Sequence, residues 1–444
     1  MREFHGGSKK GQVYKTGKSW ILYDWANSVY ATNIMAAIFP IYFTSVCGGE
    51  DTAGMQWWGY GTSLATLIVA VLAPILGSLG DYKGMKKKFF TFFMLVGVLC
   101  TLIMAIFDNW QMLLLGYVLS YIGFAGSCLF YDSFLTDVTT GDRMDKVSAW
   151  GYAMGYIGGS TIPFLLSIGI LLVMGMDNPV AVKLVVVLTS VWWGLFSIPM
   201  MHNVHQKYYL EGKPEHMASA AFSNVGRTLR SIVQNKGLFF YLIAYFCYID
   251  GVGTVIHMST SYGSTLGLDT VGMILALLVT QIVAMPCSIL FGRLAKRIGS
   301  VRMIGVAIAV YFLICVVGFY MGYIIEVDPN ATATAQTLFW MMAFLVGTVQ
   351  GGIQALSRSY FSRLVPPDKS NEYFGFFDIF GKFATVVGPF LVALVTGFTG
   401  RSSFGILSLL VLFAVGGLLL FLGRNHMKAS EQEAEAARKA AEHS

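Results

Sequence analysis

Twelve apolar stretches, each long enough to cross a lipid bilayer, constrain the fold of this sequence more than any other feature. A helix needs roughly 20 mainly apolar residues to cross the hydrocarbon core of a membrane. Stretches of that kind lie at 20–46, 57–79, 89–107, 110–135, 147–174, 180–201, 237–260, 270–295, 302–324, 334–358, 372–399 and 402–423. Only 12% of the 444 residues are charged, about half the fraction found in soluble domains. The sequence therefore predicts an all-α, polytopic membrane protein with twelve transmembrane helices.

Lysine and arginine residues are distributed unevenly between the two sides of these predicted helices. If the N-terminus is cytoplasmic, only Lys183 and Arg401 fall in outer loops and Lys382 falls inside a helix, while the others lie in cytoplasmic loops and tails. Cytoplasmic loops of membrane proteins carry such an excess of positive charge, so we expect both termini in the cytoplasm. The basic residues form short clusters and no single basic face, so nucleic acid is not an expected partner.

A polar stretch at 202–236 divides the predicted helices into two sets of six. We expect a cytoplasmic N-terminal segment, a six-helix bundle, a cytoplasmic linker, a second six-helix bundle and a cytoplasmic tail at 1–19, 20–201, 202–236, 237–423 and 424–444. A repeat supports the division, because GSLGDYKG at 77–84 and GRLAKRIG at 292–299 share the pattern Gly-x-Leu-small-x-x-x-Gly. Paired halves with a solute path between them are frequent among secondary transporters. The alternative is that both turns need glycine and basic residues for topology alone.

Motifs of catalysis and of metal binding are absent from the sequence. It has no HExxH, GxSxG or GxxxxGK[ST] motif, each of which would indicate a specific enzyme class. The six cysteines stand singly, and His202 and His205 have no third ligand nearby, so neither a disulfide framework nor a metal site is predicted. We expect no enzyme activity, no cofactor and no metal; a membrane enzyme and a receptor or scaffold are the alternatives.

Four motifs resemble those of a known transporter superfamily. GSLGDYKG at 77–84 is similar to the signature loop of the major facilitator superfamily. Within that superfamily, three further motifs resemble the vacuolar amino-acid effluxers known from fungal autophagy: YDWANSVYAT at 23–32, YIDGVGTVI at 248–256 and GGIQALSRSYFSRLVP at 351–366. The resemblance runs from about Trp20 to Leu422. The compact loops are more similar to those of the bacterial members, the "unknown major facilitator family one", which implies a bacterial inner membrane.

The resemblance implies two pseudo-symmetric six-helix bundles that work by alternating access, with amino acids as cargo. It also implies that the first, fourth, seventh and tenth helices line the solute cavity. The loop around Asp81 is then expected to lock the two halves on the cytoplasmic side when the cavity faces outward. The second copy of this loop departs from the pattern, because Lys296 stands where the first copy has Asp81. Its charge contacts should therefore differ.

Asp250 is the strongest candidate for a functional residue inside the membrane. From a helix start near Gly237 it lies roughly 20 Å along a helix that rises 1.5 Å per residue, a little past the bilayer centre. Because a charge there costs at least a few kcal/mol, we expect this carboxyl to take up and release a proton. His257 follows seven residues later on the same face and is a candidate second member of the proton path. The alternative is an aspartate that only joins helices by hydrogen bonds.

Polar residues of the first, tenth and eleventh helices are candidate contacts of the solute or of a coupling ion. Gln350, Gln354 and Arg358 repeat at i+4 and i+8, and Asp378 is four residues from Lys382, so these two can pair. The alternative for all of them is structural, since polar side chains join helices in membrane bundles and arginine can anchor at headgroup level. The complete expected set is Asp24, Asn27, Tyr30, Asn33, Asp250, His257, Gln281, Gln350, Gln354, Arg358, Asp378 and Lys382.

Gating residues are expected in the cytoplasmic loops. Asp81 ends the second helix beside Gly84, and the lysines that follow are interpreted as topology determinants. Asp132 and Asp137 lie near the end of the fourth helix and, with Arg143, are expected partners in a cytoplasmic gate. The complete expected set is Gly77, Asp81, Gly84, Asp132, Asp137, Arg143, Gly292 and Arg297.

Together these features predict a secondary active transporter for a small solute. An amino acid or a related small carboxylate is the favoured cargo, with protons or another cation as the coupling ion. The alternative is a cation-coupled symporter of the same fold for a sugar or another organic solute. The expected partners are the small-molecule substrate, the lipid bilayer and the coupling cation, and the protein is expected to be a monomer.

Overall fold

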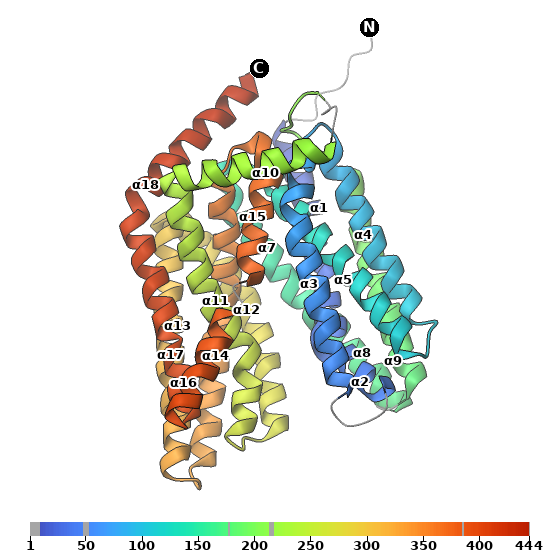
Figure 1. Cartoon of the computed structure of the whole chain (residues 1–444), viewed down its shortest axis with the longest axis vertical. Coiled ribbons are helices and arrows are strands. Elements are labelled where there is room, and N and C mark those ends of the chain that lie inside the picture. The colour runs from blue at the N-terminus through green and yellow to red at the C-terminus, as the bar shows by residue number, and fades with distance from the viewer. Residues whose placement is uncertain (1–8, 48–52, 176–177, 213–216, 384–385, 444) are drawn as a thin grey trace. The chain divides into compact units, whose positions relative to one another are not determined.

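The structure is a computed structural model that describes residues 9–47, 53–175, 178–212, 217–383 and 386–443. Within these ranges the regular structure is helical, apart from one isolated β-bridge between Tyr82 and Leu210 (Figure 1). The predicted all-α class is confirmed. Contacts divide the chain into two compact units, each of which has its own buried interior.

The first unit comprises residues 1–147, 154–227 and 367–376. Its helices are α1 (Lys9–Tyr30), η1 (Ala31–Ala37), α2 (Phe39–Cys47), α3 (Ala53–Gly80), α4 (Met85–Met104), α5 (Trp110–Ser133), α6 (Leu135–Val138), η2 (Gly141–Arg143), η3 (Gly155–Thr161), α8 (Ile162–Met174), α9 (Pro179–Asn203) and η4 (Pro367–Lys369). The stretches η1 and η3 are π-helical. They are joined by a hydrogen bond of 3.0 Å from Thr32 Oγ1 to Ser160 Oγ.

The second unit comprises residues 148–153, 228–366 and 377–444. Its helices are α11 (Lys236–Thr265), α12 (Thr270–Ile298), α13 (Ser300–Val327), α14 (Thr332–Leu364), α16 (Val387–Thr399), α17 (Ser402–Ser408) and α18 (Leu410–His443). Three helices contribute to both units: α7 (Met144–Met154), α10 (Met217–Gln234) and α15 (Ser370–Phe383). The bundle boundaries expected from the sequence stay a prediction, and the contact units differ from them at 148–153 and 367–376.

Ten helices of the described residues are long and apolar enough to cross a membrane. The first predicted span corresponds to a pair of segments, Lys15–Ala37 and Phe39–Cys47, bent by 40°, which makes an eleventh candidate if the pair is one span. The remaining predicted span, 372–399, contains two shorter helices, since α15 ends at Phe383 and α16 begins at Val387. Residues 384 and 385 lie outside the described residues.

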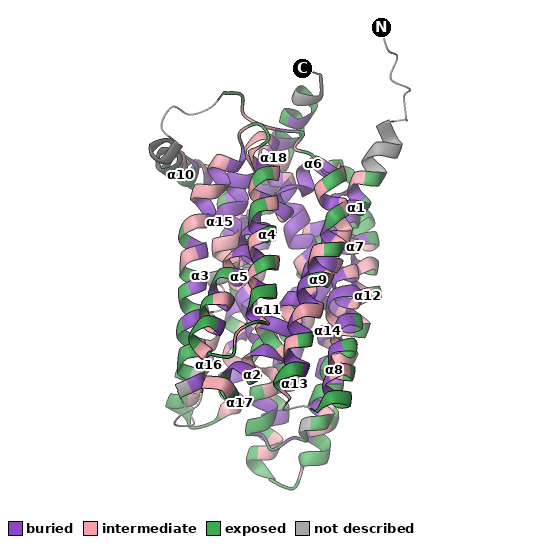
Figure 2. Cartoon of the chain, turned by 90° about the vertical axis from the view of Figure 1, so that its right-hand side faces the viewer, coloured by how far each residue is buried: buried purple, intermediate pink, exposed green. Residues whose placement is uncertain are grey.

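Large apolar side chains cover the outer faces of the helices as well as the interior. Figure 2 shows exposed residues along α3, α4 and α13, and Leu67, Leu99 and Leu313 are each about half exposed. A soluble protein rarely exposes continuous apolar faces of this kind, whereas lipid is as apolar as the leucines themselves. The surface is therefore suited to lipid contact, as the sequence predicts.

Short polar caps and glycine turns set the starts of several helices. Asn109, Asn178, Asn235 and Asp269 each accept a hydrogen bond from a backbone N–H two or three residues further on, as N-cap residues do. The repeated loops use glycine instead. Gly84 and Gly299 have φ of +73° and +98°, a region open to glycine, and they directly precede α4 and α13.

The linker and the tail both contain ordered helix. The linker was expected only as a polar stretch, but it contains α10. The tail continues α18 to His443. It contacts α14, where Glu431 of the tail forms an ion pair of 3.1 Å with Arg363. Met427 and Ala434 of the tail are buried.

Candidate functional site

The buried carboxylate of Asp81 receives the first backbone amides of helix α15 within the first unit. Asp81 follows the last residue of α3 and is 1% exposed. Its Oδ1 accepts hydrogen bonds from the backbone N–H of Asn371 at 2.9 Å and from Asn371 Nδ2 at 2.8 Å, and its Oδ2 accepts the N–H of Glu372 at 3.1 Å. The first amides of a helix have no partner inside the helix, and a carboxylate there also interacts favourably with the helix dipole. Asp81 therefore caps α15.

A buried ion pair lies beside this cap. Lys86 Nζ is 2.7 Å from Asp137 Oδ2, and both side chains are fully buried. Lys86 Nζ also donates to Ser370 Oγ at 2.9 Å, while Asp137 Oδ1 accepts the backbone N–H groups of Lys207 at 2.7 Å and Tyr208 at 3.0 Å. Buried charges are tolerated when they are paired and hydrogen-bonded in this way. The pair and the cap both hold the start of α15.

The sequence did not indicate the partners of two residues in this region. Lys86, interpreted as one of the topology-determining lysines, has a fully buried side chain. Asp137, an expected gate residue, pairs with Lys86, because the turn of α6 aims its carboxylate at the start of α4, and the gate itself stays a prediction. Asp132 is half-buried in the last turn of α5.

Two of the three expected gate glycines, Gly77 and Gly84, lie close to polar groups of the first unit. A Cβ at Gly77 would lie 2.5 Å from the carbonyl oxygen of Asn371, so glycine permits the close approach of α3 to α15. Gly84 donates its N–H to Gln206 Oε1 at 2.9 Å. Gly292 and Arg297 belong to α12 of the second unit, where Arg297 is exposed. The structure thus groups Gly77, Asp81, Gly84 and Asp137.

Burial raises the pKa of Asp81 from 3.8 to about 8, although the Lys86 charge and the N–H donors of Asn371 and Glu372 lower it. The folded protein therefore binds this proton more tightly than the unfolded chain does. The contribution of Asp81 to stability is then largest below pH 4 and declines as the pH rises toward 8. We expect the melting temperature of the wild type, relative to that of Asp81→Asn, to decrease between pH 5 and pH 8. Parallel melting curves of the two proteins across this range would contradict the assignment.

Asp250 holds the start of another helix within the second unit. It lies in α11 with no exposed surface, and its Oδ2 accepts the backbone N–H of Gly388 in the first turn of α16 at 2.9 Å. Its Oδ1 has no hydrogen-bond partner among the described residues. A side chain at Gly388 would collide with Thr254, so glycine admits the carboxylate. His257 is exposed whereas Asp250 is buried, and no described contact joins them.

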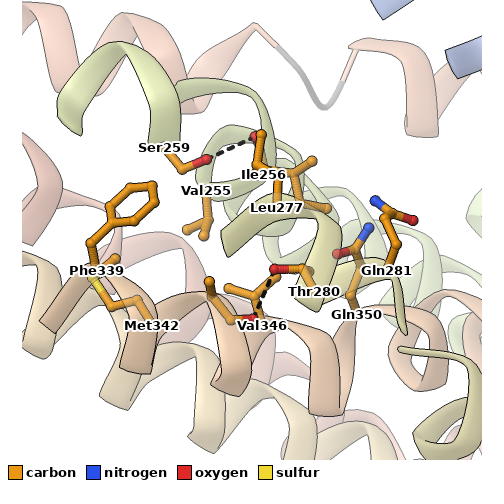
Figure 3. A pocket seen from close by; sticks show the side chains of 11 residues that line it. Val255, Ile256, Ser259, Leu277, Thr280, Gln281, Phe339, Met342, Val346 and Gln350 are labelled. Atoms are coloured by element: carbon orange, nitrogen blue, oxygen red, sulfur yellow. Dashed lines mark hydrogen bonds between the residues drawn. The ribbon is translucent and has the colours of Figure 1, made fainter. Parts of the chain in front are cut away.

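A cavity of about 60 Å³ lies between α11, α12 and α14 (Figure 3). Its wall is mostly apolar and includes Val255, Phe339 and Met342. The amide groups of Gln281 and Gln350 lie at the same end of the cavity (Figure 3). Gln281 Oε1 is buried without a hydrogen-bond partner among the described residues, so it is an acceptor that a bound molecule can use.

Arg358 is engaged by helix α7 in the second unit. It is 3% exposed, its Nε donates to Ser148 Oγ at 3.0 Å and its Nη2 donates to the Ser148 carbonyl at 3.2 Å. The guanidinium also lies over the ring of Tyr152 at 4.4 Å. Arg358 is therefore not an anchor at the membrane surface. Gln354 and Asp378 are half-buried, and the side chain of Lys382 lies outside the described residues, so its pairing stays a prediction.

The polar residues of the first helix join it to its neighbours. The hydroxyl of Tyr131 in α5 donates to Asp24 Oδ2 at 2.7 Å, and Tyr30 Oη lies 2.7 Å from Ser120 Oγ. Asn27 is buried and its Nδ2 is 3.7 Å from Cys128 Sγ.

Asn33 is a buried residue of the π-helix η1. Its Nδ2 donates to Ser167 Oγ at 2.9 Å and to Thr189 Oγ1 at 3.0 Å. Its Oδ1 is buried without a partner among the described residues. Tyr30 and Asn33 therefore connect helices, which is the structural alternative considered for them, and a part in binding stays a proposal.

Comparison with known proteins decides the family. Residues 57–434 match the family model described as "Vacuole effluxer Atg22 like". The chain belongs to this Atg22-like family. The Atg22-like chain is 46% identical over 416 residues to YxiO of Bacillus subtilis, described as an uncharacterized MFS-type transporter, and the match covers 91% of this chain and 94% of YxiO.

Autophagy-related protein 22 of Cryptococcus neoformans is more distant. It is 25% identical over 309 residues, which cover 65% of this chain and 52% of the fungal protein, so the match spans about half of that relative. The fold is similar to that of the proton:xylose symporter XylE of the major facilitator superfamily, with a TM-score of 0.70 and 12% identity over 93% of this chain and 96% of XylE. This Atg22-like protein is thus a multi-pass membrane transporter of the major facilitator fold and not an enzyme.

Proposed function

We propose that this Atg22-like transporter carries a small amino acid or a related small carboxylate across the bacterial inner membrane, with both termini in the cytoplasm. It works by alternating access, with protons as the coupling ion. The single observation that carries the proposal is the buried carboxyl of Asp250, which has one oxygen on the first turn of α16 and the other without a described partner.

Proton coupling follows from the position of this carboxyl. Ionisation of a buried carboxyl inside a membrane span is costly, so the charged form needs compensation. The backbone N–H of Gly388 and the dipole of α16 supply it, because the N-terminus of a helix favours a negative charge. Protonation removes the charge and weakens the interaction of Asp250 with the first turn of α16. The same group can thus bind a proton and alter the helix that it caps.

The cavity of the second unit supports the substrate class. Its volume of about 60 Å³ has room for about four to six water-sized groups. The four carbon atoms of a leucine side chain would therefore fit in it. Its apolar wall suits such a side chain. Gln281 and Gln350 offer both amide N–H donors and carbonyl acceptors, which suit the carboxylate and the ammonium group of an amino acid. Arg358, another candidate contact of the solute, donates a hydrogen bond to Ser148 instead.

Alternating access is assigned to the Asp81 network. The cap of α15 by Asp81 and the buried Lys86–Asp137 pair attach the segment 367–376 to the first unit, while Phe377 and the following residues belong to the second unit. Release and return of this segment would be a discrete switch of the kind that packed interfaces allow. This switch would act as the predicted cytoplasmic gate.

The test is counterflow of radiolabelled solutes in proteoliposomes. We expect saturable exchange of leucine or alanine, and no exchange of glucose or xylose. Gln281→Leu/Gln350→Leu should raise the half-saturating concentration by about tenfold or more, because two hydrogen bonds to charged groups are lost. The matched control is Gln111→Leu, which removes an exposed glutamine of α5. Exchange of sugars alone would refute the substrate class and favour the sugar symporter alternative.

A further inference from the structure

Helix α10 carries basic residues but no acidic ones. Its 18 residues, Met217–Gln234, and the two that follow contain Arg227, Arg230 and Lys236 and no aspartate or glutamate. Phe222, Val225, Leu229 and Val233 recur at spacings of three and four. Residues at this spacing share one face of a helix. The arginines lie outside this apolar stripe, since Arg230 is one residue and Arg227 two residues from Leu229. The helix is thus amphipathic and basic.

The centre of the apolar stripe is uncovered in the folded chain. Leu229 is 48% exposed and Val233 is 57% exposed. The helix packs through a neighbouring face instead, where Thr228 and Ile232 are 5% and 3% exposed. Arg227 and Arg230 are exposed. Among the described residues, α10 therefore packs through Thr228 and Ile232 and leaves Leu229 and Val233 of its apolar stripe exposed.

The position of α10 in the chain decides what covers this face. α10 ends at Gln234 and α11, a membrane-spanning helix, begins at Lys236. Only Asn235 separates them, and its side chain caps α11 by accepting the N–H of Leu238 at 3.1 Å. The C-terminal end of α10 is thus fixed next to the first turn of a membrane-spanning helix. Figure 1 shows α10 running across the end of α11 rather than continuing it.

We propose that α10 lies on the cytoplasmic membrane surface and binds anionic phospholipid, with Leu229 and Val233 in the acyl boundary and Arg227 and Arg230 at the headgroup phosphates. A basic amphipathic helix with low overall hydrophobicity lies in the membrane interface, and each basic residue near an anionic surface strengthens that attachment. No acidic side chain of α10 opposes this attraction. The inference is independent of the solute carried and of the coupling ion.

Hydrogen–deuterium exchange of the full chain in nanodiscs tests this inference. The nanodiscs contain either phosphatidylcholine alone or phosphatidylcholine with phosphatidylglycerol at about 7:3. We expect the amides of 224–234 to exchange about tenfold or more slowly in the anionic nanodiscs, because two arginines gain headgroup contacts. Peptides from α4 should exchange equally in both lipids. Leu229→Gln/Val233→Gln should exchange fast in both lipids.

The arginine variants separate charge from apolar contact. Arg227→Gln/Arg230→Gln should exchange like the wild type in phosphatidylcholine and lose the slowing in anionic lipid. The matched control, Lys428→Gln/Lys439→Gln, removes two exposed charges from the tail helix and should keep the slowing. Equal exchange of wild-type α10 in the two lipids would overturn the proposal. So would slow exchange in detergent that depends on protein concentration, which would identify a second copy of the chain as the occupant.

Discussion

Asp250→Asn is expected to abolish transport driven by a pH gradient while exchange of substrate at equal pH continues. Asparagine has nearly the same shape as aspartate and can still accept the N–H of Gly388, so α16 keeps its cap. It has no proton to release, and its neutral side chain interacts less strongly with the helix dipole. The measurement is uptake into proteoliposomes with an imposed pH gradient, compared with counterflow in the same preparation. We expect gradient-driven uptake to fall to the level of empty liposomes.

Two controls distinguish coupling from a structural role. Asp269→Asn replaces the cap of α12, where Asp269 accepts the N–H of Gly272, and asparagine is an equally good cap; its gradient-driven uptake should be unchanged. Asp250→Leu leaves the first turn of α16 without an acceptor and should reduce the yield of folded protein. If Asp250→Asn accumulated substrate like the wild type, Asp250 would only join α11 to α16, and the proton role would pass to Asp24.

The sequence predicted most of the fold because bilayer crossing leaves a strong pattern. Apolar length and the distribution of lysine and arginine are properties of each segment alone, so they are visible without an alignment. The prediction treats 372–399 as one span and does not anticipate the start of α16 at Val387, although Gly388 and Pro389 stand in its first turn, where proline is tolerated. The side chain that binds this first turn, Asp250, lies on another helix. Likewise the predicted elements do not include α10, because the stretch 202–236 that contains it is polar overall.

The sequence indicates which acidic residues are candidates for the sites, but it does not indicate which groups contact them. Asp81 and Asp250 stand out in the sequence because they are acidic groups at or within apolar spans. The sequence does not show that each faces the N-terminus of a helix far along the chain, since Asn371 and Gly388 carry no charge. The prediction groups Lys86 with Lys87 and Lys88, which follow it in the sequence. The helix turns Lys86 inward and Lys88 outward, so Lys86 is buried and Lys88 is exposed. Lys86 is four residues from Phe90, which is also buried, and this helical spacing indicates a shared inward face.

Lys86→Met is expected to destabilise the folded protein by roughly 3–5 kcal/mol, the usual consequence of leaving one charge of a buried pair alone. The side chain of Asp137 is fully buried, and without Lys86 its carboxylate keeps, among the described residues, only the N–H groups of Lys207 and Tyr208. The measurement is the free energy of unfolding from SDS titration in mixed micelles. Lys88→Met is the matched control, because Lys88 is exposed in the same turn, and it should change stability by less than about 0.5 kcal/mol.

The double variant Lys86→Met/Asp137→Asn decides whether the loss comes from the unpaired charge. Asparagine still accepts the two backbone amides through Oδ1 but carries no charge, so most of the lost stability should return. Lys86→Met should also raise the pKa of Asp81 further, because the Lys86 charge lowers it in the wild type. The decline of stability with pH should then extend above pH 8 in the single variant. A double variant no more stable than Lys86→Met would instead assign the loss to the packing of the lysine side chain and its bond to Ser370.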